Sequence, residues 1–119
     1  MSYVFDIEGE TVWSPSLRTG AMYIALTEAA GRTLERPTGL IAVAEDMRDI
    51  DLSTFNDFAQ ALLEYYSTTK HMVAHEMLRG ILLTSLVMLQ RGGVELASKN
   101  AEEAKILSAL PNFSLSMPT

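Results

Sequence analysis

The N-terminal residues follow the alternation of a β-strand. Tyr3, Phe5 and Ile7 fall at every second position and would share one face of an extended chain. Glu8 and Gly9 then favour a tight turn, and the segment that follows returns beside the first strand. The pattern predicts a β-hairpin at the start of the chain.

Apolar residues at helical spacing begin after this hairpin. Ser14 before Pro15 is a helix-start signal, because serine accepts a hydrogen bond from a free backbone amide and proline at the first helical position loses none. We therefore expect a first helix over residues 15–30, with the glycine that follows as its stop. A second helix, capped by Asp51 or Ser53, is indicated by apolar residues at three- and four-residue steps: Phe55, Phe58, Ala59, Leu62 and Tyr66.

The segment between these two helices is ambiguous. A break at Pro37 and Gly39 precedes residues 40–44, a short apolar run that fits either a buried strand or a helical turn. We favour a short helix through Met47, because no turn signal follows the run.

A long helix over residues 70–91 changes character along its length. After Gly80, residues 81–89 direct apolar side chains to nearly every side and must be enclosed. These nine residues are far fewer than the ~20 that span a bilayer, so we expect no membrane contact. The segment is a central core helix or a self-association surface. Few other elements are available to surround it, which favours a homodimer. Before Gly80 the apolar residues share one half-buried face: Val73, Ala74, Met77 and Leu78.

The expected fold is α+β and mostly α: a compact bundle of about four to five helices with a small N-terminal β-hairpin. Asn100 and Glu103 have the spacing of a capping box and begin the last helix, which Pro111 ends. We assign residues 1–111 to a single globular domain. Residues 112–119 form a C-terminal tail, either loose or placed as a strand against the hairpin.

Composition supports one packed domain. The chain has 119 residues, of which 48% are hydrophobic and 20% charged, values typical of a globular protein. It has no cysteine, which removes disulfides, thiolate metal sites and cysteine nucleophiles. The N-terminus lacks the positive start and apolar stretch of a secretory signal, so we expect a cytoplasmic bacterial protein.

The negative charge is concentrated in the first half of the chain. Of a net charge of −6, residues 1–60 supply ten acids against four bases, whereas residues 61–119 hold five of each. Such a surface repels nucleic acid and favours a basic protein partner. The candidate partner-binding residues are acids that meet lysines and arginines of that partner, although the same segment also fits a solvated loop whose last acid caps a helix: Glu45, Asp46, Asp49 and Asp51.

The two histidines are the candidate metal ligands. His71 and His75 are four residues apart and would lie on one side of a helix, where two imidazoles can share a metal. A third ligand is required, from Glu64, Glu76 or an acid of residues 45–51. The alternative is that both histidines are partly buried polar residues.

No sequence motif of catalysis or cofactor binding is present. The seven glycines form neither a nucleophile elbow nor a phosphate-binding loop. We expect no cofactor and assign no catalytic residue.

Three segments carry a resemblance to a known family. VFDIEGETVWSPSLRTG, PTGLIAVAEDM and LVMLQRGGVEL resemble a family of small uncharacterised proteins from actinobacteria. That resemblance implies no activity and no site residues.

These observations favour a non-enzymatic protein-binding module. An immunity or antitoxin protein that blocks a basic toxin through an acidic surface is one form of it. Two alternatives stay open: a metal-dependent helical enzyme that uses His71 and His75, and a structural or assembly protein that self-associates through residues 81–89.

Overall fold

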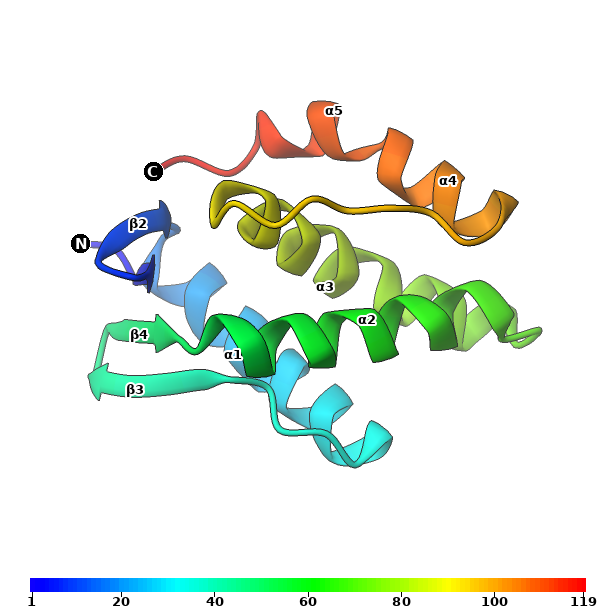
Figure 1. Cartoon of the computed structure of the whole chain (residues 1–119). Helices are drawn as coiled ribbons and strands as arrows, with labels where there is room; N and C mark the ends of the chain where they lie inside the picture. The colour runs from blue at the N-terminus through cyan, green and yellow to red at the C-terminus, as the bar shows by residue number, and fades with distance from the viewer.

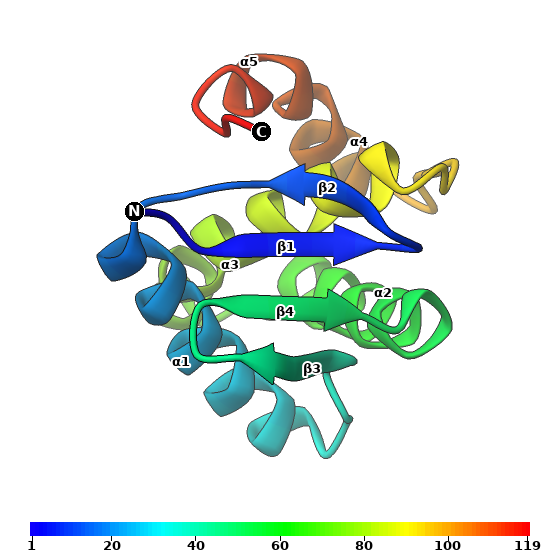
Figure 2. The same cartoon turned by 90° about the vertical axis from the view of Figure 1, so that its left-hand side faces the viewer.

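A mixed sheet with helices against one face makes up the protein. The computed structural model describes residues 1–119, and Figures 1 and 2 show the sheet at one side with the helices behind it. The chain runs through β1 (Val4–Ile7), β2 (Glu10–Trp13), α1 (Leu17–Leu34), β3 (Leu40–Ala44), β4 (Met47–Ile50), α2 (Leu52–Thr68), α3 (Met72–Arg91), α4 (Ala101–Ser108) and α5 (Leu110–Ser114).

The sheet has four strands in the order β2-β1-β4-β3. β1 is antiparallel to β2 and parallel to β4, and β3 is antiparallel to β4. The protein is therefore α+β, but the expected helical bundle with a small N-terminal hairpin is wrong. The first two strands form the antiparallel pair that the alternation predicts, and a second hairpin joins them to complete one sheet.

The short helix expected through Met47 is also wrong. Residues 40–44 form β3, the turn at Glu45 and Asp46 reverses the chain, and β4 follows. Pairing decides the conformation here, because β4 hydrogen-bonds both to β3 and to the distant strand β1. The turn contains neither glycine nor proline, so its sequence carries no strong signal.

One face of the sheet is buried and the other is open. Phe5, Ile7 and Ile50 are at most 5% exposed and point toward the helices, whereas Asp6 and Asp49 point to the open face. In Figure 2 the strands lie in front of α1, α2 and α3. The open face is therefore available to solvent and to partners.

Helix α1 begins and ends later than its sequence predicts. The side chain of Ser16, not Ser14, accepts a hydrogen bond from the Thr19 amide, at 3.3 Å. Gly31 lies inside the helix, where an added Cβ would stand 2.9 Å from the Arg36 carbonyl oxygen. The helix ends at Glu35, whose φ of 54° is left-handed. Gly31 therefore serves close packing and does not stop the helix.

The second half of helix α3 is enclosed within a single chain. All of residues 81–89 are at most 8% exposed, and α3 contacts α1, α2, β2 and α5. Helices α1, α2 and α5 and strand β2 therefore surround this segment without a second copy, which removes the reason for expecting a dimer through it. By length and composition α3 is the one helix apolar enough to cross a membrane, and half of the relevant window is buried in the protein; a buried core helix can have the same length and composition.

The C-terminal residues pack across the first hairpin. The Arg91 guanidinium donates to the Val12 carbonyl at 2.8 Å and to the Ser114 carbonyl at 3.2 Å. The Ser14 amide donates to the Pro118 carbonyl at 2.8 Å, and Met117 is buried. Residues 112–114 thus belong to the short helix α5, and residues 115–119 continue from it and are attached to the body of the protein.

Candidate functional site

An acid-lined cleft lies where the parallel strands β1 and β4 both end. Parallel strands have their carboxyl ends at the same edge of a sheet, so the residues that follow them meet there. The acidic cleft has a volume of about 720 Å³ and is lined by Glu8, Gly9, Ile41, Asp49, Ile50, Asp51, Leu52, Ser53, Asn56 and Val94. Its lining contains three carboxylates and no lysine or arginine, which favours a cationic ligand.

The three carboxylates of the acidic cleft have different tasks. Asp51 caps α2: its Oδ2 accepts from the Thr54 amide at 3.3 Å and from the Thr54 hydroxyl. Its charge also meets the positive end of the helix dipole. The side chains of Glu8 and Asp49 are exposed and form no hydrogen bond or ion pair within the protein. These two are therefore the carboxylates available to a partner.

Asp6 lies beside Asp49 on the open face of the sheet. The parallel register of β1 and β4 makes the two residues neighbours, and the Thr11 hydroxyl donates to Asp6 Oδ1 at 2.8 Å. The negative charges of Asp6 and Asp49 repel each other, and a cation bound near both would offset this repulsion. Sequence reasoning missed Asp6, since nothing local shows that β1 pairs with β4.

The other two predicted acids lie elsewhere. Glu45 and Asp46 form the exposed turn between β3 and β4, at the opposite end of β4 from the acidic cleft. Arg48 stands between the two acidic groups, where its guanidinium donates to the Ala44 and Met47 carbonyls at 3.0 and 3.1 Å. The structure thus brings Asp49 and Asp51 together with Glu8 and leaves Glu45 and Asp46 outside.

The two histidines have different surroundings. His71 is exposed at the N-cap position of α3, whereas His75 stacks on Tyr66 with ring centroids 3.8 Å apart. No group of three or more histidine, aspartate or glutamate side chains is placed to hold a metal ion. The metal-dependent alternative therefore lacks its third ligand.

A small polar cleft surrounds His75. It has a volume of about 270 Å³ and is lined by Tyr66, His75, Arg79, Glu102, Lys105 and Ile106. Burial raises the pKa of the Tyr66 hydroxyl, and the positive charge of Arg79 opposes that shift. Because both signs of charge line this cleft, it selects neither anions nor cations.

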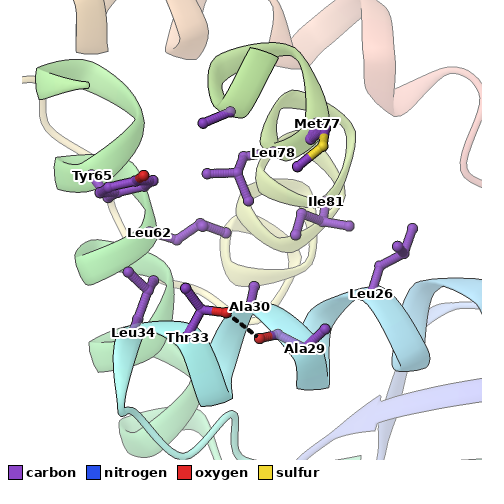
Figure 3. A pocket seen from close by; sticks show the side chains of 11 residues that line it. Leu26, Ala29, Ala30, Thr33, Leu34, Leu62, Tyr65, Met77, Leu78 and Ile81 are labelled. Atoms are coloured by element: carbon purple, nitrogen blue, oxygen red, sulfur yellow. Dashed lines mark hydrogen bonds between the residues drawn. The ribbon is translucent and has the colours of Figure 1, made fainter. Parts of the chain in front are cut away.

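An apolar groove lies between α1, α2 and α3. Figure 3 shows side chains of the three helices pointing into one hollow, among them Leu26 from α1, Tyr65 from α2 and Met77 from α3. The hollow has a volume of about 340 Å³, and ten of its eleven lining residues are hydrophobic. A second hollow, of about 390 Å³, continues the groove toward Trp13 and shares Leu26, Met77 and Ile81 with the first.

Large apolar side chains around this groove are exposed to solvent. We call the following set the apolar strip: Met22 (57% exposed), Leu26 (50%), Tyr65 (38%) and Met77 (69%), which line the two hollows, and Val73 (73%), which lies one helical turn before Met77 on α3. A contiguous apolar surface of this kind is typical of a protein interface or ligand groove. The sequence placed Val73 and Met77 on a half-buried face, but the neighbouring helix α1 contacts α3 too sparsely to cover them.

The comparisons with known proteins establish a family and no activity. No curated protein and no solved structure matches the chain significantly. One family profile, described as "Family of unknown function (DUF6086)", matches residues 1–119. Since the match covers the whole chain, the protein belongs to this family of unknown function.

Proposed function

We propose that the protein is a non-enzymatic binding module that holds lysine or arginine side chains of a basic protein partner in the acidic cleft. The observation that carries this proposal is the unpaired state of Glu8 and Asp49 at the carboxyl ends of β1 and β4. Carboxylates without an internal partner have both oxygens free to accept hydrogen bonds from an incoming cation. Asp6 adds a further negative charge next to Asp49.

The uncovered edge of the sheet supports a protein as the ligand. β3 pairs only with β4, so its other side carries backbone groups without a strand neighbour. Ile41 lines the acidic cleft and is 51% exposed, and Val43 on the same strand is 49% exposed. An extended basic segment that passes this edge would place apolar side chains on Ile41 and cations on Asp49.

Selection of peptides tests the proposal with a defined probe. A random twelve-residue peptide library is selected on the immobilised protein, and the binding of enriched peptides is measured by titration calorimetry. We expect enrichment of lysine and arginine, and affinity that falls as salt is added. The double variant Glu8→Gln, Asp49→Asn should bind these peptides at least about tenfold more weakly, a loss of about 1.4 kcal/mol.

A matched variant separates local contact from overall charge. Glu64→Gln, Glu102→Gln removes the same two charges from exposed positions on α2 and α4, away from the acidic cleft. It should bind with nearly unchanged affinity. Equal binding by the wild type and the Glu8→Gln, Asp49→Asn variant would refute the proposal.

An immunity or antitoxin role is one specific form of this function. It adds the requirement that the basic partner is toxic to the cell in which it is made. The test is co-expression with a toxin candidate: the wild type should protect the cell, and the Glu8→Gln, Asp49→Asn variant should not.

A further inference from the structure

We propose that the apolar strip binds a second copy of this chain. The two copies form a two-fold symmetric homodimer through α1 and the first half of α3. The acidic cleft takes no part in this contact. The dimer and the proposed function can therefore be tested independently of each other.

The amount of exposed apolar surface is the first argument. Five large side chains of the apolar strip are between 38% and 73% exposed, and all of them except Val73 line the two adjoining hollows of the groove. Burying such side chains against the same surface of a second copy removes apolar area from water on both chains. Interfaces between identical subunits are more apolar than other protein surfaces, in line with this composition.

The shape of the groove matches its own protruding side chains. Met77 stands between the two hollows of about 340 and 390 Å³ and is 69% exposed. In a symmetric dimer each Met77 can enter a hollow of the other chain, because an isologous interface presents every protrusion to the same surface. Methionine side chains are flexible and adapt to irregular hollows, which suits this role.

Charged side chains beside the groove would form pairs of opposite sign between two copies related by a two-fold axis. Arg18 lies on α1 one turn before Met22, and Glu76 lines the second hollow from α3. A two-fold axis along the groove sets α1 of one chain against α3 of the other, so Arg18 faces the partner's Glu76. Glu28 is the one acid of α1, and its Oε1 accepts a hydrogen bond from the Thr38 hydroxyl at 2.5 Å within the same chain.

Gly80 permits a close approach on the same face. It lies in the middle of α3, is exposed, lines the second hollow, and has nothing within 4 Å of an added Cβ. A helix surface without a side chain at this point lets another helix come nearer to its backbone.

Sedimentation equilibrium of the full chain tests the dimer. The wild type should have twice the mass of the 13.1 kDa chain at micromolar concentration. Met77→Lys should shift it to the monomer, whereas Ile41→Lys, a matched change of an exposed apolar residue on the sheet, should leave the dimer intact. A wild type that stays monomeric at about 100 μM, where even a weak dimer would be populated, would overturn the proposal. A dimer that persists in the Met77→Lys variant would also overturn the proposal. The groove would then hold a foreign helix, a small apolar ligand or nothing.

A charge exchange tests the arrangement of the two chains. Arg18→Glu and Glu76→Arg alone should each weaken the dimer at least about tenfold, and the combined variant should restore it. Failure of the combined variant to recover would overturn the two-fold arrangement along the groove. Circular dichroism verifies that each variant is folded, and Val73→Lys, at a 73% exposed position, replaces Met77→Lys if that variant unfolds.

Discussion

The hydroxyl of Tyr23 lies 2.6 Å from Oγ of Ser85 in the interior of the protein, which joins α1 to α3. Ser85 Oγ in turn donates to the Ile81 carbonyl at 2.7 Å, so Tyr23 is the donor to Ser85. This bond holds the two walls of the apolar groove at a set separation. Tyr23→Phe should lower the free energy of unfolding at pH 7 by about 1 kcal/mol, as measured by urea denaturation.

The same tyrosine should make the protein sensitive to alkali. Burial raises the pKa of the Tyr23 hydroxyl above its ordinary value of 10.0. Above pH 10 the unfolded chain releases this proton while the native protein keeps it, so stability falls as pH rises. The fall should be shallower for Tyr23→Phe by about 1.4 kcal/mol per pH unit. Parallel slopes in urea denaturation between pH 10 and 11 would contradict this assignment.

Substitution of Asp51 should lower the stability of the protein, whereas substitution of Asp49 should lower binding and leave stability nearly unchanged. Asp51→Ala removes the cap of α2 and should cost about 1 kcal/mol of unfolding free energy. Asp49→Asn removes an exposed carboxylate without an internal partner, so thermal unfolding should change little. A large loss of stability in Asp49→Asn would show that this residue has a structural task and would disqualify it as a test of binding.

Two glycines should respond in opposite directions to alanine. Gly31→Ala places a Cβ 2.9 Å from the backbone oxygen of Arg36 and should destabilise the protein by about 1–3 kcal/mol. Gly80→Ala meets open space in the monomer and should stabilise α3 by about 1 kcal/mol. Thermal unfolding at low protein concentration measures both effects without a contribution from association.

The aromatic ring of His75, not its nitrogen atoms, should matter for stability. His75 stacks on Tyr66, and its Nδ1 is buried without a hydrogen-bond partner. His75→Phe keeps the stacked ring and removes the unpaired nitrogen, so the melting temperature should be equal or higher. His75→Ala should lose about 1 kcal/mol. A strong decrease for the phenylalanine variant would indicate that the imidazole nitrogen has a partner or a function.

The local elements of this protein were visible in its sequence. The pair of strands around Gly9, a helix capped by Asp51 or Ser53, and the enclosed helix over residues 81–89 were all predicted, and the structure places the cap at Asp51. The strand pair and the cap depend on residues close together in the chain: φ is positive at Glu8 and Gly9, and Asp51 needs only the amide of Thr54. Such interactions act at short range along the chain, and a pattern of residue types describes them well.

The sheet and both candidate surfaces were decided by the tertiary structure. β4 becomes a central strand because it pairs with β1, and that pairing places Asp6 beside Asp49 and Glu8 near Asp51. The exposure of Val73 and Met77 depends on how closely α1 packs against α3, which a helical repeat in one segment does not describe. Which apolar and charged side chains meet, and which remain uncovered, follows from contacts between segments far apart in the chain.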